Sequence, residues 1–465
     1  MRVVKKCQSL VLVVCAVLGS LSAQTHKTQH NGGGTSVNNA MDVQLPLKTF
    51  RNLGAEAKGC IECHAKETPG IVADWKMSRH AHAGVSCIDC HSVTKDSPML
   101  TMDGHHGSKI PISVLVSTNT CAKCHEKEVE EFRHSGHARG AVQVFAKQSM
   151  RDLMRLVEGR GHPDLGRAPE ATGCIQCHGS IIKLDKHRRP TPETWPTYGI
   201  GTAFPDGSVG NCASCHSAHK FSLEEARKPA ACASCHLGPD HPDIEIYNNS
   251  MHGHIFNAEG NKWNFDAAPG TWKVPDFRAP TCATCHMSGN SKSAVTHNVS
   301  RRLKWNLFMP LSELRTGGYE TASDAFKFEN KITHGNPLAG NPQGPEAARA
   351  EMKAGCMDCH NSTHIDNFFT MADKNILLYN EYWKEAVKMK EELAKKNLLG
   401  KDMWADEFQN TMYHLWHHEG RRMRQGGIMG GPDFSHWHGV FEVQQDIRKL
   451  RKIYEKRLKT NKIED

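Results

Sequence analysis

The spacing of apolar residues along the chain predicts helices and few strands. Apolar side chains recur every three or four positions in several polar segments, as on one face of a helix. These segments are 126–133, 144–157 (stopped by Gly159-Arg160-Gly161), 375–397, 403–424 and 440–459, the last two separated by Gly426-Gly427, Gly430-Gly431 and Pro432. No segment shows the alternation of a half-buried strand. The pattern predicts a mainly α protein, with irregular loops in its first part and long helices near its end.

The first 23 residues have the pattern of a secretory signal peptide. Three basic residues precede an apolar core at 10–18, and Leu21-Ser22-Ala23 forms a small-residue cleavage site. A membrane anchor is the alternative, but the apolar core is shorter than the roughly 20 residues of a span. No later stretch is apolar enough to span. We therefore expect export to the periplasm or an equivalent compartment, with the polar residues 24–45 as a flexible leader.

The apolar residues are too few to fill the interior by themselves. Only 38% of the 465 residues are apolar, a low share for a globular protein. Of the 18 cysteines, two lie in the signal peptide and the other sixteen all belong to copies of the pentapeptide C-x-x-C-H. This pentapeptide attaches a c-type haem through its cysteines and binds the iron through its histidine. The eight copies are Cys60-Cys63-His64, Cys87-Cys90-His91, Cys121-Cys124-His125, Cys174-Cys177-His178, Cys212-Cys215-His216, Cys232-Cys235-His236, Cys282-Cys285-His286 and Cys356-Cys359-His360.

Eight copies predict eight covalent haems in place of an aliphatic core. Zinc-binding knuckles also combine cysteine with histidine, but identical pentapeptides behind an export signal favour haem. The haem propionates should make the protein acidic overall, although the formal charge of the chain is +8. Its lysines and arginines are therefore better explained as propionate partners than as a nucleic-acid-binding patch.

Histidines outside the pentapeptides are candidates for the second axial position. A haem used only for electron transfer usually takes two axial ligands, whereas a haem that binds substrate keeps one position open. The pattern aromatic-x-x-Ser-x-His occurs at 75–80, 132–137 and 247–252, and its spacing suits a short helix that presents a histidine. Since 22 of the 30 histidines lie outside the pentapeptides, counting alone does not identify an open haem. The distal candidates are His80, His105 or His106, His137, His187, His219, His252 and His297.

An acid and a base stand side by side soon after the sixth pentapeptide. Asp240 and His241 lie between two prolines, in a segment that suits a turn. A histidine ordinarily exchanges protons near neutral pH, and a neighbouring carboxylate can orient it or relay protons. From spacing alone, a surface turn or a distal ligand for a neighbouring haem explains the pair equally well.

Together, these motifs resemble the octahaem hydroxylamine oxidoreductases, a family of trimeric, mostly helical multihaem cytochromes. The resemblance runs from about Cys60 to Val443. It rests on the eight pentapeptides in order and on the runs 191–196 (TPETWP), 238–242 (GPDHP), 296–297 (TH), 416–422 (WHHEGRR) and 437–439 (WHG). It implies that the fourth haem is catalytic, that Asp240 and His241 line its distal side, and that the other seven haems have two histidine ligands.

The chain departs from the oxidising members of that family at one position. In those members a tyrosine of the neighbouring subunit bonds covalently to the catalytic haem, within a run that resembles residues 432–439 here. The aligned residue is Phe434, which has no phenolic oxygen; Tyr413, upstream, is a candidate substitute. Because the bond distorts the macrocycle and so shifts the potential of the iron, its absence favours electron delivery to substrate. Members without the bond resemble reductases of nitrite and hydroxylamine.

The resulting expectation is an octahaem c-type cytochrome that reduces nitrite, to nitric oxide or further, and hydroxylamine to ammonia. Oxidation of hydroxylamine or hydrazine toward a cytochrome partner is one alternative, and an electron-transfer protein without substrate is another. We expect a catalytic haem domain at 46–365 and a helical region at 366–465 that packs on it and joins subunits. Partners would be small nitrogen ligands, a redox cytochrome and further copies in a homotrimer, without a membrane span.

Overall fold

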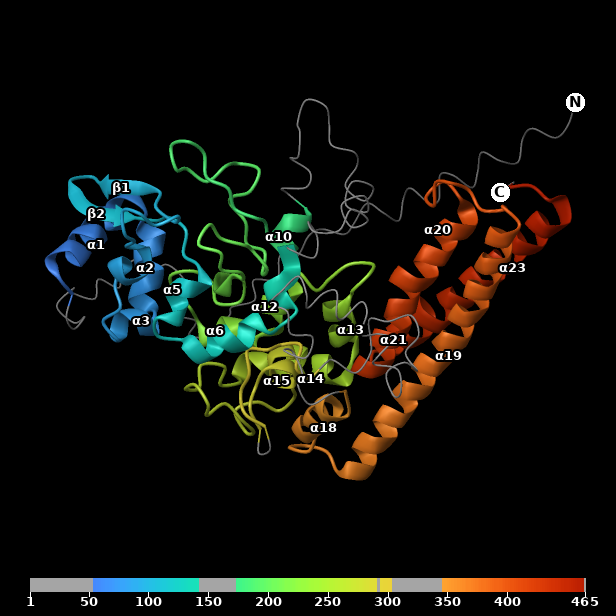
Figure 1. Cartoon of the computed structure of the whole chain (residues 1–465). Coiled ribbons are helices and arrows are strands. Elements are labelled where there is room, and N and C mark those ends of the chain that lie inside the picture. Colours follow the sequence, from blue (N-terminus) through green and yellow to red (C-terminus); the bar gives the residue numbers. More distant parts are fainter. Residues whose placement is uncertain (1–52, 142–172, 291–292, 303–344, 464–465) are drawn as a thin grey trace, which may run out of the picture. The chain divides into compact units, whose positions relative to one another are not determined.

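The haem pentapeptides of the first part of the chain lie in short helices joined by loops (Figure 1). The computed structural model describes residues 53–141, 173–290, 293–302 and 345–463. The signal peptide, the leader and the helix predicted at 144–157 lie outside these residues. The elements up to residue 141 are α1 Ala55–Glu67, α2 Pro69–Met77, α3 Arg79–His82, α4 Cys87–His91, β1 Met102–His105, β2 Ser108–Ile112, α5 Thr118–Ala122, α6 Glu126–Arg133 and the 3₁₀ turn η3 His137–Arg139.

The middle part continues the same construction. Its helices are short, and most of its residues lie in turns and loops. They are α10 Cys174–His178, η4 Cys212–Ser214, α11 Leu223–Arg227, α12 Pro229–Ala233, α13 Asp243–Asn249, α14 Met251–Glu259, η5 Gly260–Lys262 and α15 Cys282–His286.

The serine of the aromatic-x-x-Ser-x-His pattern ends one helix and starts the next. Ser78 Oγ donates to the Trp75 carbonyl and accepts from Ala81 N at 3.0 Å, which caps α3. Ser250 repeats this arrangement between α13 and α14, with the Tyr247 carbonyl as its acceptor. A capping serine of this kind stabilises a helix start by about 1 kcal/mol. The pattern therefore produces a bend, after which a histidine projects from a new helical turn.

A two-stranded sheet was not predicted. Strands β1 and β2 pair antiparallel, with Met102 opposite Ile112. Gly104 interrupts the pairing at φ 91°, where an added Cβ would lie 2.9 Å from the Ser108 carbonyl. Pro111 also sits within β2. Because the strands are short and contain a glycine and a proline, they lack the alternating pattern that sequence reasoning looks for.

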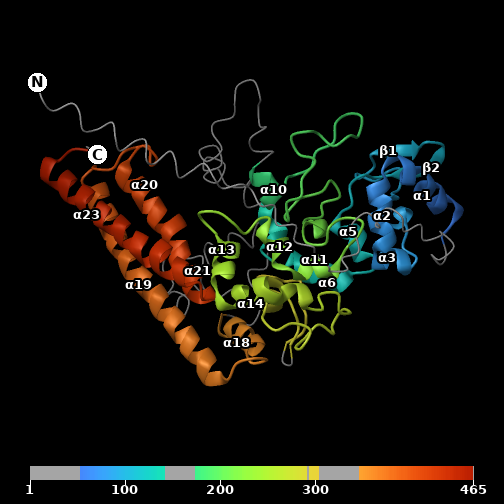
Figure 2. The ribbon, with the colours of Figure 1, turned by 180° about the vertical axis from the view of Figure 1, so that it is seen from behind.

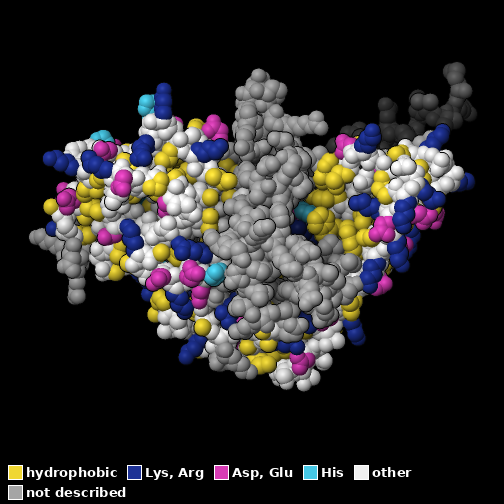
Figure 3. All heavy atoms as spheres, in the orientation of Figure 1, with side chains coloured by type: hydrophobic (Ala, Val, Ile, Leu, Met, Phe, Trp, Pro, Cys, Tyr) yellow, Lys and Arg dark blue, Asp and Glu magenta, His cyan; other side chains and the backbone are white. Residues whose placement is uncertain are grey.

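Long helices fill the last part of the chain, as predicted, and Figures 1 and 2 both show α19 alongside α21 and α23. None of the helices in the described segments is long and apolar enough to cross a membrane. On the face in Figure 3, basic, acidic and apolar side chains are interspersed over the described elements. The elements are α18 Pro345–Cys356, α19 Ser362–Lys395, α20 Glu407–His414, the π-helical turn η6 Leu415–Glu419, α21 Gly420–Met429, α22 Pro432–Ser435, the π-helical turn η7 His436–Phe441 and α23 Glu442–Thr460.

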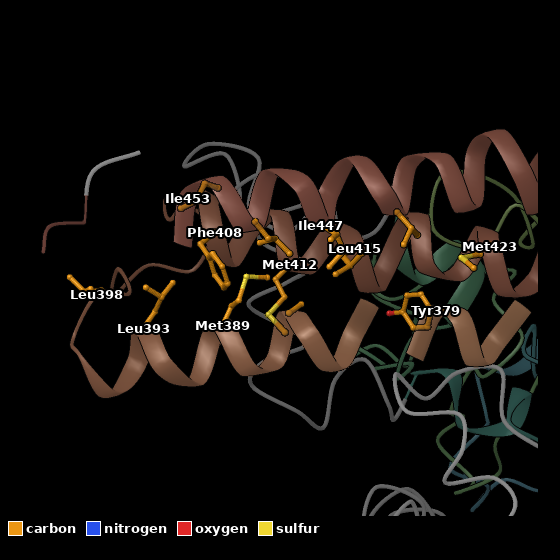
Figure 4. Packing of buried hydrophobic residues seen from close by; sticks show 13 residues of the cluster. Tyr379, Met389, Leu393, Leu398, Phe408, Met412, Leu415, Met423, Ile447 and Ile453 are labelled. Carbon is orange, nitrogen blue, oxygen red and sulfur yellow. The ribbon is translucent and has the colours of Figure 1, made fainter. Parts of the chain in front are cut away.

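The largest apolar core lies between these long helices. Figure 4 shows side chains of α19, such as Met389 and Leu393, packed against Phe408 and Met412 of α20. Beside them Arg457 and Asp406 form an ion pair at 3.0 Å with both side chains fully buried. Removing one partner of such a pair leaves a buried charge and typically costs about 3–5 kcal/mol. The helical region thus has a core of its own, independent of haem.

Two predicted helix limits were wrong. Helix α19 begins at Ser362, where the Asn361 side chain accepts from His364 N and caps it. The predicted break at Gly426-Gly427 does not occur, because α21 continues to a left-handed Gly430. An added Cβ on Gly426 would lie 2.5 Å from the Phe434 backbone. Glycine is therefore kept inside this helix for close packing, not to end it.

Candidate haem sites and active site

A continuous cavity runs past the attachment pentapeptides. Its volume is about 4260 Å³, and residues of all eight pentapeptides line it. A pocket for one drug-sized molecule is roughly 300–1,000 Å³, so this cavity has room for several large groups. The sixteen motif cysteines form no disulfides with one another. These features fit covalently attached haems.

Several attachment histidines use their Nδ1 atom within the protein. His91 Nδ1 donates to the Ser113 carbonyl at 2.8 Å, and His236 Nδ1 lies 2.8 Å from Asp243 Oδ2. His64 Nδ1 lies 2.8 Å from a threonine hydroxyl. Metal-binding histidines commonly donate one ring N–H in this way while the other nitrogen binds the metal. The Nε2 atoms of these three rings thus remain available to iron.

Most of the predicted distal histidines face an attachment histidine. An imidazole nitrogen binds a metal at about 2 Å, so two rings on opposite sides of one iron have centroids about 6 Å apart. The described pairs at this separation are His64–His105 (6.1 Å), His125–His80 (6.0 Å), His91–His219 (6.3 Å), His236–His137 (6.0 Å) and His360–His252 (6.2 Å). His219 holds an uncommon positive φ of 70°, a strain that tends to occur at functional positions.

The remaining candidates differ in their surroundings. Burial lowers the pKa of His216 to about 4, and the charge of His297 is the second-largest cause of this shift. His297 therefore lies close to His216. His106 has its ring 4.2 Å from His105 and is not the ring recorded opposite His64.

The predicted distal histidine His187 and the attachment histidine His286 depart from this pattern. His187 is exposed in a loop, where its backbone N–H donates to Asp185, and it does not line the cavity. Among the described residues, none of the ring pairs about 6 Å apart includes His286, although its ring is buried and its charge acts on His137. The geometry thus gives no support to His187 as a ligand.

The pentapeptides follow one another in space in a different order from that in the chain. The third motif lies near the fifth, and the fourth lies near the sixth, which also neighbours the fifth and the seventh. The cysteine pairs that interact across motifs are Cys60–Cys87, Cys90–Cys121, Cys121–Cys212, Cys215–Cys232, Cys177–Cys235, Cys232–Cys282 and Cys285–Cys356. Among the described contacts, the fourth motif lies beside a continuous row formed by the others.

Backbone packing fixes the fourth pentapeptide. Gly201 N donates to the His178 carbonyl at 3.2 Å, and Ile200 N donates to the Cys177 carbonyl at 3.1 Å. At Gly179, whose φ is 88°, an added Cβ would lie 2.3 Å from Thr202 N, and at Gly201 it would lie 2.3 Å from Gly140 N. The chain segments therefore meet backbone to backbone, which holds His178 in place.

Asp240 and His241 lie near His178. Their charges, with that of His236, act on the His178 imidazole, whose pKa burial lowers first of all. His241 Nδ1 lies 3.0 Å from Asp240 Oδ1. The His241 ring is also 6.0 Å from His236, as far away as His137 is. The turn thus lies between the fourth and sixth motifs, so both roles considered for His241 stay open.

Helical residues from the other end of the chain complete this site. His417 Nε2 and Arg421 Nη1 each lie 3.8 Å from Asp240 Oδ2, and Arg421 also approaches the Asp240 carbonyl at 3.4 Å. The Tyr413 hydroxyl lies 3.1 Å from His417 Nδ1, and the two rings stack at 4.8 Å. Sequence reasoning gave His417 and Arg421 no role in the site and considered Tyr413 only as a substitute for the cross-linking tyrosine. Their spacing of four residues, which aligns side chains on one helix face, was the signal available.

The site holds one carboxylate that stays charged. Burial raises the pKa of Asp240, but contact with His241 and the positive charge of Arg421 outweigh it and lower the pKa well below its ordinary value. Burial, followed by the charge of Arg421, lowers the pKa of His417 to about 3. At neutral pH His417 is therefore an uncharged ring, which can accept from Tyr413 and donate toward Asp240.

Comparison with known families agrees with the haem motifs. Residues 201–326 match a family described as "Seven times multi-haem cytochrome CxxCH", and residues 158–237 match one described as "Cytochrome c3". The chain is a multihaem c-type cytochrome.

A curated relative shows which multihaem cytochromes the chain is similar to. The cytochrome is 32% identical over 276 residues to the "Probable nitrite reductase-hydroxylamine oxidoreductase fusion protein" of Kuenenia stuttgartiensis. The matched region covers 53% of the cytochrome and 27% of that relative. The cytochrome thus spans about a quarter of the length of this relative. It is related to the hydroxylamine oxidoreductase-like proteins over about half of its own length.

Two solved structures share its fold. One, described as "Hypothetical multiheme protein", has a TM-score of 0.73 and 24% identity over 92% of the cytochrome and 100% of that chain. The other, a reducing HAO-like protein complex of Kuenenia stuttgartiensis, has a TM-score of 0.62 and 20% identity over 87% of the cytochrome and 86% of that chain. The mainly helical multihaem cytochrome fold with long C-terminal helices, expected from the sequence, is confirmed.

Phe434 occupies the position where the resemblance places a cross-linking tyrosine. It lies in α22, with its ring 5.4 Å from that of His438. The Tyr413 hydroxyl, the candidate substitute, is engaged with His417 of its own chain. Phe434 therefore has no phenolic oxygen to form a bond, and the phenolic oxygen of Tyr413 is already hydrogen-bonded to His417.

Proposed function

We propose that this cytochrome reduces nitrite, to nitric oxide or further, and hydroxylamine to ammonia at an open haem bound by Cys174, Cys177 and His178. The observation that carries the proposal is the Asp240–His241 pair next to His178, held by Arg421. The names of the nitrite reductase-hydroxylamine oxidoreductase relative and of the reducing complex support the same class of substrate.

A c-type haem with an open position would supply electrons and a binding site for the nitrogen atom of the substrate. Loss of oxygen from nitrite or hydroxylamine as water consumes protons. His241 delivers them, and the ionised Asp240 orients its ring from 3.0 Å. Tyr413 and His417 extend this network toward the helical region and can pass a proton back to Asp240. Arg421 provides positive charge that favours an anionic substrate.

The proposal extends to the surroundings of the enzyme. We propose eight haems, export through the N-terminal signal and a homotrimer that exchanges electrons with a redox partner cytochrome. The haem domain at 46–365 and the helical region at 366–465 remain the proposed units. The solved reducing relative is itself a protein complex, which supports a protein partner.

Carbon monoxide binding tests the open haem. The dithionite-reduced protein should bind one carbon monoxide per chain, because the other irons carry two histidines, while haem analysis should give eight haems per chain. Titration followed by the Soret band measures carbon monoxide binding, and a pyridine haemochrome assay of the same sample counts the haems. No binding at all would identify an electron-transfer protein without substrate, and fewer than eight haems would contradict the assigned attachment set.

Substitution of Arg421 tests substrate attraction. In Arg421→Gln the KM for nitrite should rise roughly 10–100-fold, because a charged contact is worth about 1.5–3 kcal/mol, whereas the KM for uncharged hydroxylamine should change little. Arg448→Gln, an exposed arginine of α23 that bonds Gln444, is the matched control and should behave as the parent. An equal loss for both substrates would remove the anion role of Arg421.

A further inference from the structure

A second cluster of ligand-type side chains lies in the same helix as His417 but outside the haem cavity. His414, His418 and Glu419 bring one ligand atom each within 4.8 Å of one another. The two imidazoles meet through Nδ1 atoms 2.9 Å apart. None of the three lines the haem cavity, and the proposed reaction uses none of them.

The π-helical turn η6 creates this cluster. On a regular α-helix, residues four apart share a face, which aligns His414 with His418. The π-helical turn follows i→i+5 hydrogen bonding, which brings a residue five positions on into line as well. Because η6 spans Leu415–Glu419, Glu419 joins the two histidines. Turns of this kind often occur at functional sites.

Glu419 of this cluster and its neighbour Asp446 each have one carboxylate oxygen without a hydrogen-bond partner. Glu419 Oε2 and Asp446 Oδ2 are buried without a hydrogen bond, and the negative charges of the two groups repel each other. Of the nearby cations, Arg422 lies 3.9 Å from the other oxygen of Glu419 but bonds Glu442 more closely, at 2.8 Å, and Lys449 lies 3.0 Å from Glu407. A buried carboxylate without a partner is costly, and a bound cation would remove that cost.

We propose that His414, His418 and Glu419 bind a divalent transition-metal ion, in first place Zn²⁺, with Asp446 as a neighbouring carboxylate. Two histidines and one glutamate form a known zinc ligand set. Two nitrogens that each bind one ion at about 2 Å lie roughly 3 Å apart, close to the separation of these Nδ1 atoms. Cu²⁺ prefers the same ligand types and is the competing ion.

The ion would brace the helix behind the proposed acid/base network. His417 lies between His414 and His418 in the sequence. Its ring is 5.4 Å from that of His418, and its Nε2 atom is 3.8 Å from Asp240 Oδ2. A metal that fixes the π-helical turn therefore fixes the direction in which His417 and Arg421 project. We assign the ion a positioning role, separate from haem.

Zinc titration of the full-length haem-loaded protein tests the site. After treatment with a chelator, calorimetric titration with ZnCl₂ should give one site per chain with micromolar or tighter affinity. Glu419→Gln and His418→Ala should each weaken this binding at least about 100-fold, since even neighbours of metal ligands contribute 10–100-fold. His436→Ala removes an exposed histidine of η7 and should leave the affinity unchanged.

Zinc K-edge absorption spectroscopy gives an independent reading, because scattering from imidazole rings reports two histidine ligands directly. Haem content and thermal unfolding show whether each variant is folded, and Glu419→Gln, which keeps the side-chain size, carries the test if His418→Ala does not fold. Absence of stoichiometric binding, or binding that survives both cluster substitutions, would overturn the proposal and leave the histidines as a hydrogen-bonded pair. Neither measurement depends on nitrite turnover.

Discussion

Replacing His241 with alanine should slow nitrite turnover roughly 10²–10⁴-fold, the range expected when a positioned general acid is lost. His241 stands 3.0 Å from a carboxylate that stays ionised, so the proposed proton donor disappears while Asp240 and Arg421 remain. The visible spectrum should hardly change, since in this role the ring is not a permanent iron ligand. Steady-state kinetics and spectra of the same preparation measure both effects.

His254→Ala is the matched control, because His254 is exposed in α14, just beyond the turn that holds His241. It should match the parent in rate and spectrum. If His241→Ala instead turns a low-spin haem high-spin, His241 is a ligand, and the sixth haem is the first to examine because the His236 ring lies 6.0 Å from that of His241. The acid/base assignment would then be wrong.

With a strong electron donor the protein should consume nitrite and hydroxylamine, and with an electron acceptor it should oxidise hydroxylamine slowly at best. The physical reason is Phe434, which lacks the oxygen needed for a bond to the macrocycle, so the haem is not distorted and its potential is not shifted in that way. Denaturing gels stained for haem should show single chains. Assays of reduction and of oxidation on one preparation, together with the haem-stained gel, test the prediction.

Phe434→Tyr and Tyr413→Phe form the matched pair of variants. Phe434→Tyr supplies a phenolic oxygen at the position that aligns with the cross-linking tyrosine. Of the two variants, only this one should produce covalently linked chains. A covalent trimer in the unmodified protein would contradict the prediction and identify Tyr413 as the cross-linking residue. Fast hydroxylamine oxidation without any cross-link would show that the bond does not set the direction of the reaction.

Sequence reasoning predicted the helices best where one apolar face packs on one core. The segment 440–459 and α23 nearly coincide, because α23 buries a regular stripe that includes Val443 and Ile447 against the other long helices. It was wrong where packing overrides local preference. Gly426 sits inside α21 because the Phe434 backbone approaches it too closely for any side chain, and this approach is a tertiary event that no local pattern records.

The site divides in the same way. Local motifs predicted the attachment residues and the short helices that present His80 and His252, since each depends on a few consecutive residues. Arg421 lies about 180 residues from Asp240 along the chain, so their meeting depends on the whole fold. His187 was a candidate without the aromatic-x-x-Ser-x-His pattern, and it lies in an exposed loop whose direction no motif specifies.

The placement of the fourth pentapeptide beside the row of the others has a consequence for electron transfer through the molecule. Electrons crossing from the first motif toward the eighth can follow the described neighbours through the second, third, fifth, sixth and seventh. The fourth motif is reached by a side step from Cys235 to Cys177. If the fourth haem is the substrate site, as proposed, an inhibitor bound there would therefore leave this route intact. A reaction that needs several electrons in quick succession could also draw them from both arms of the row at once.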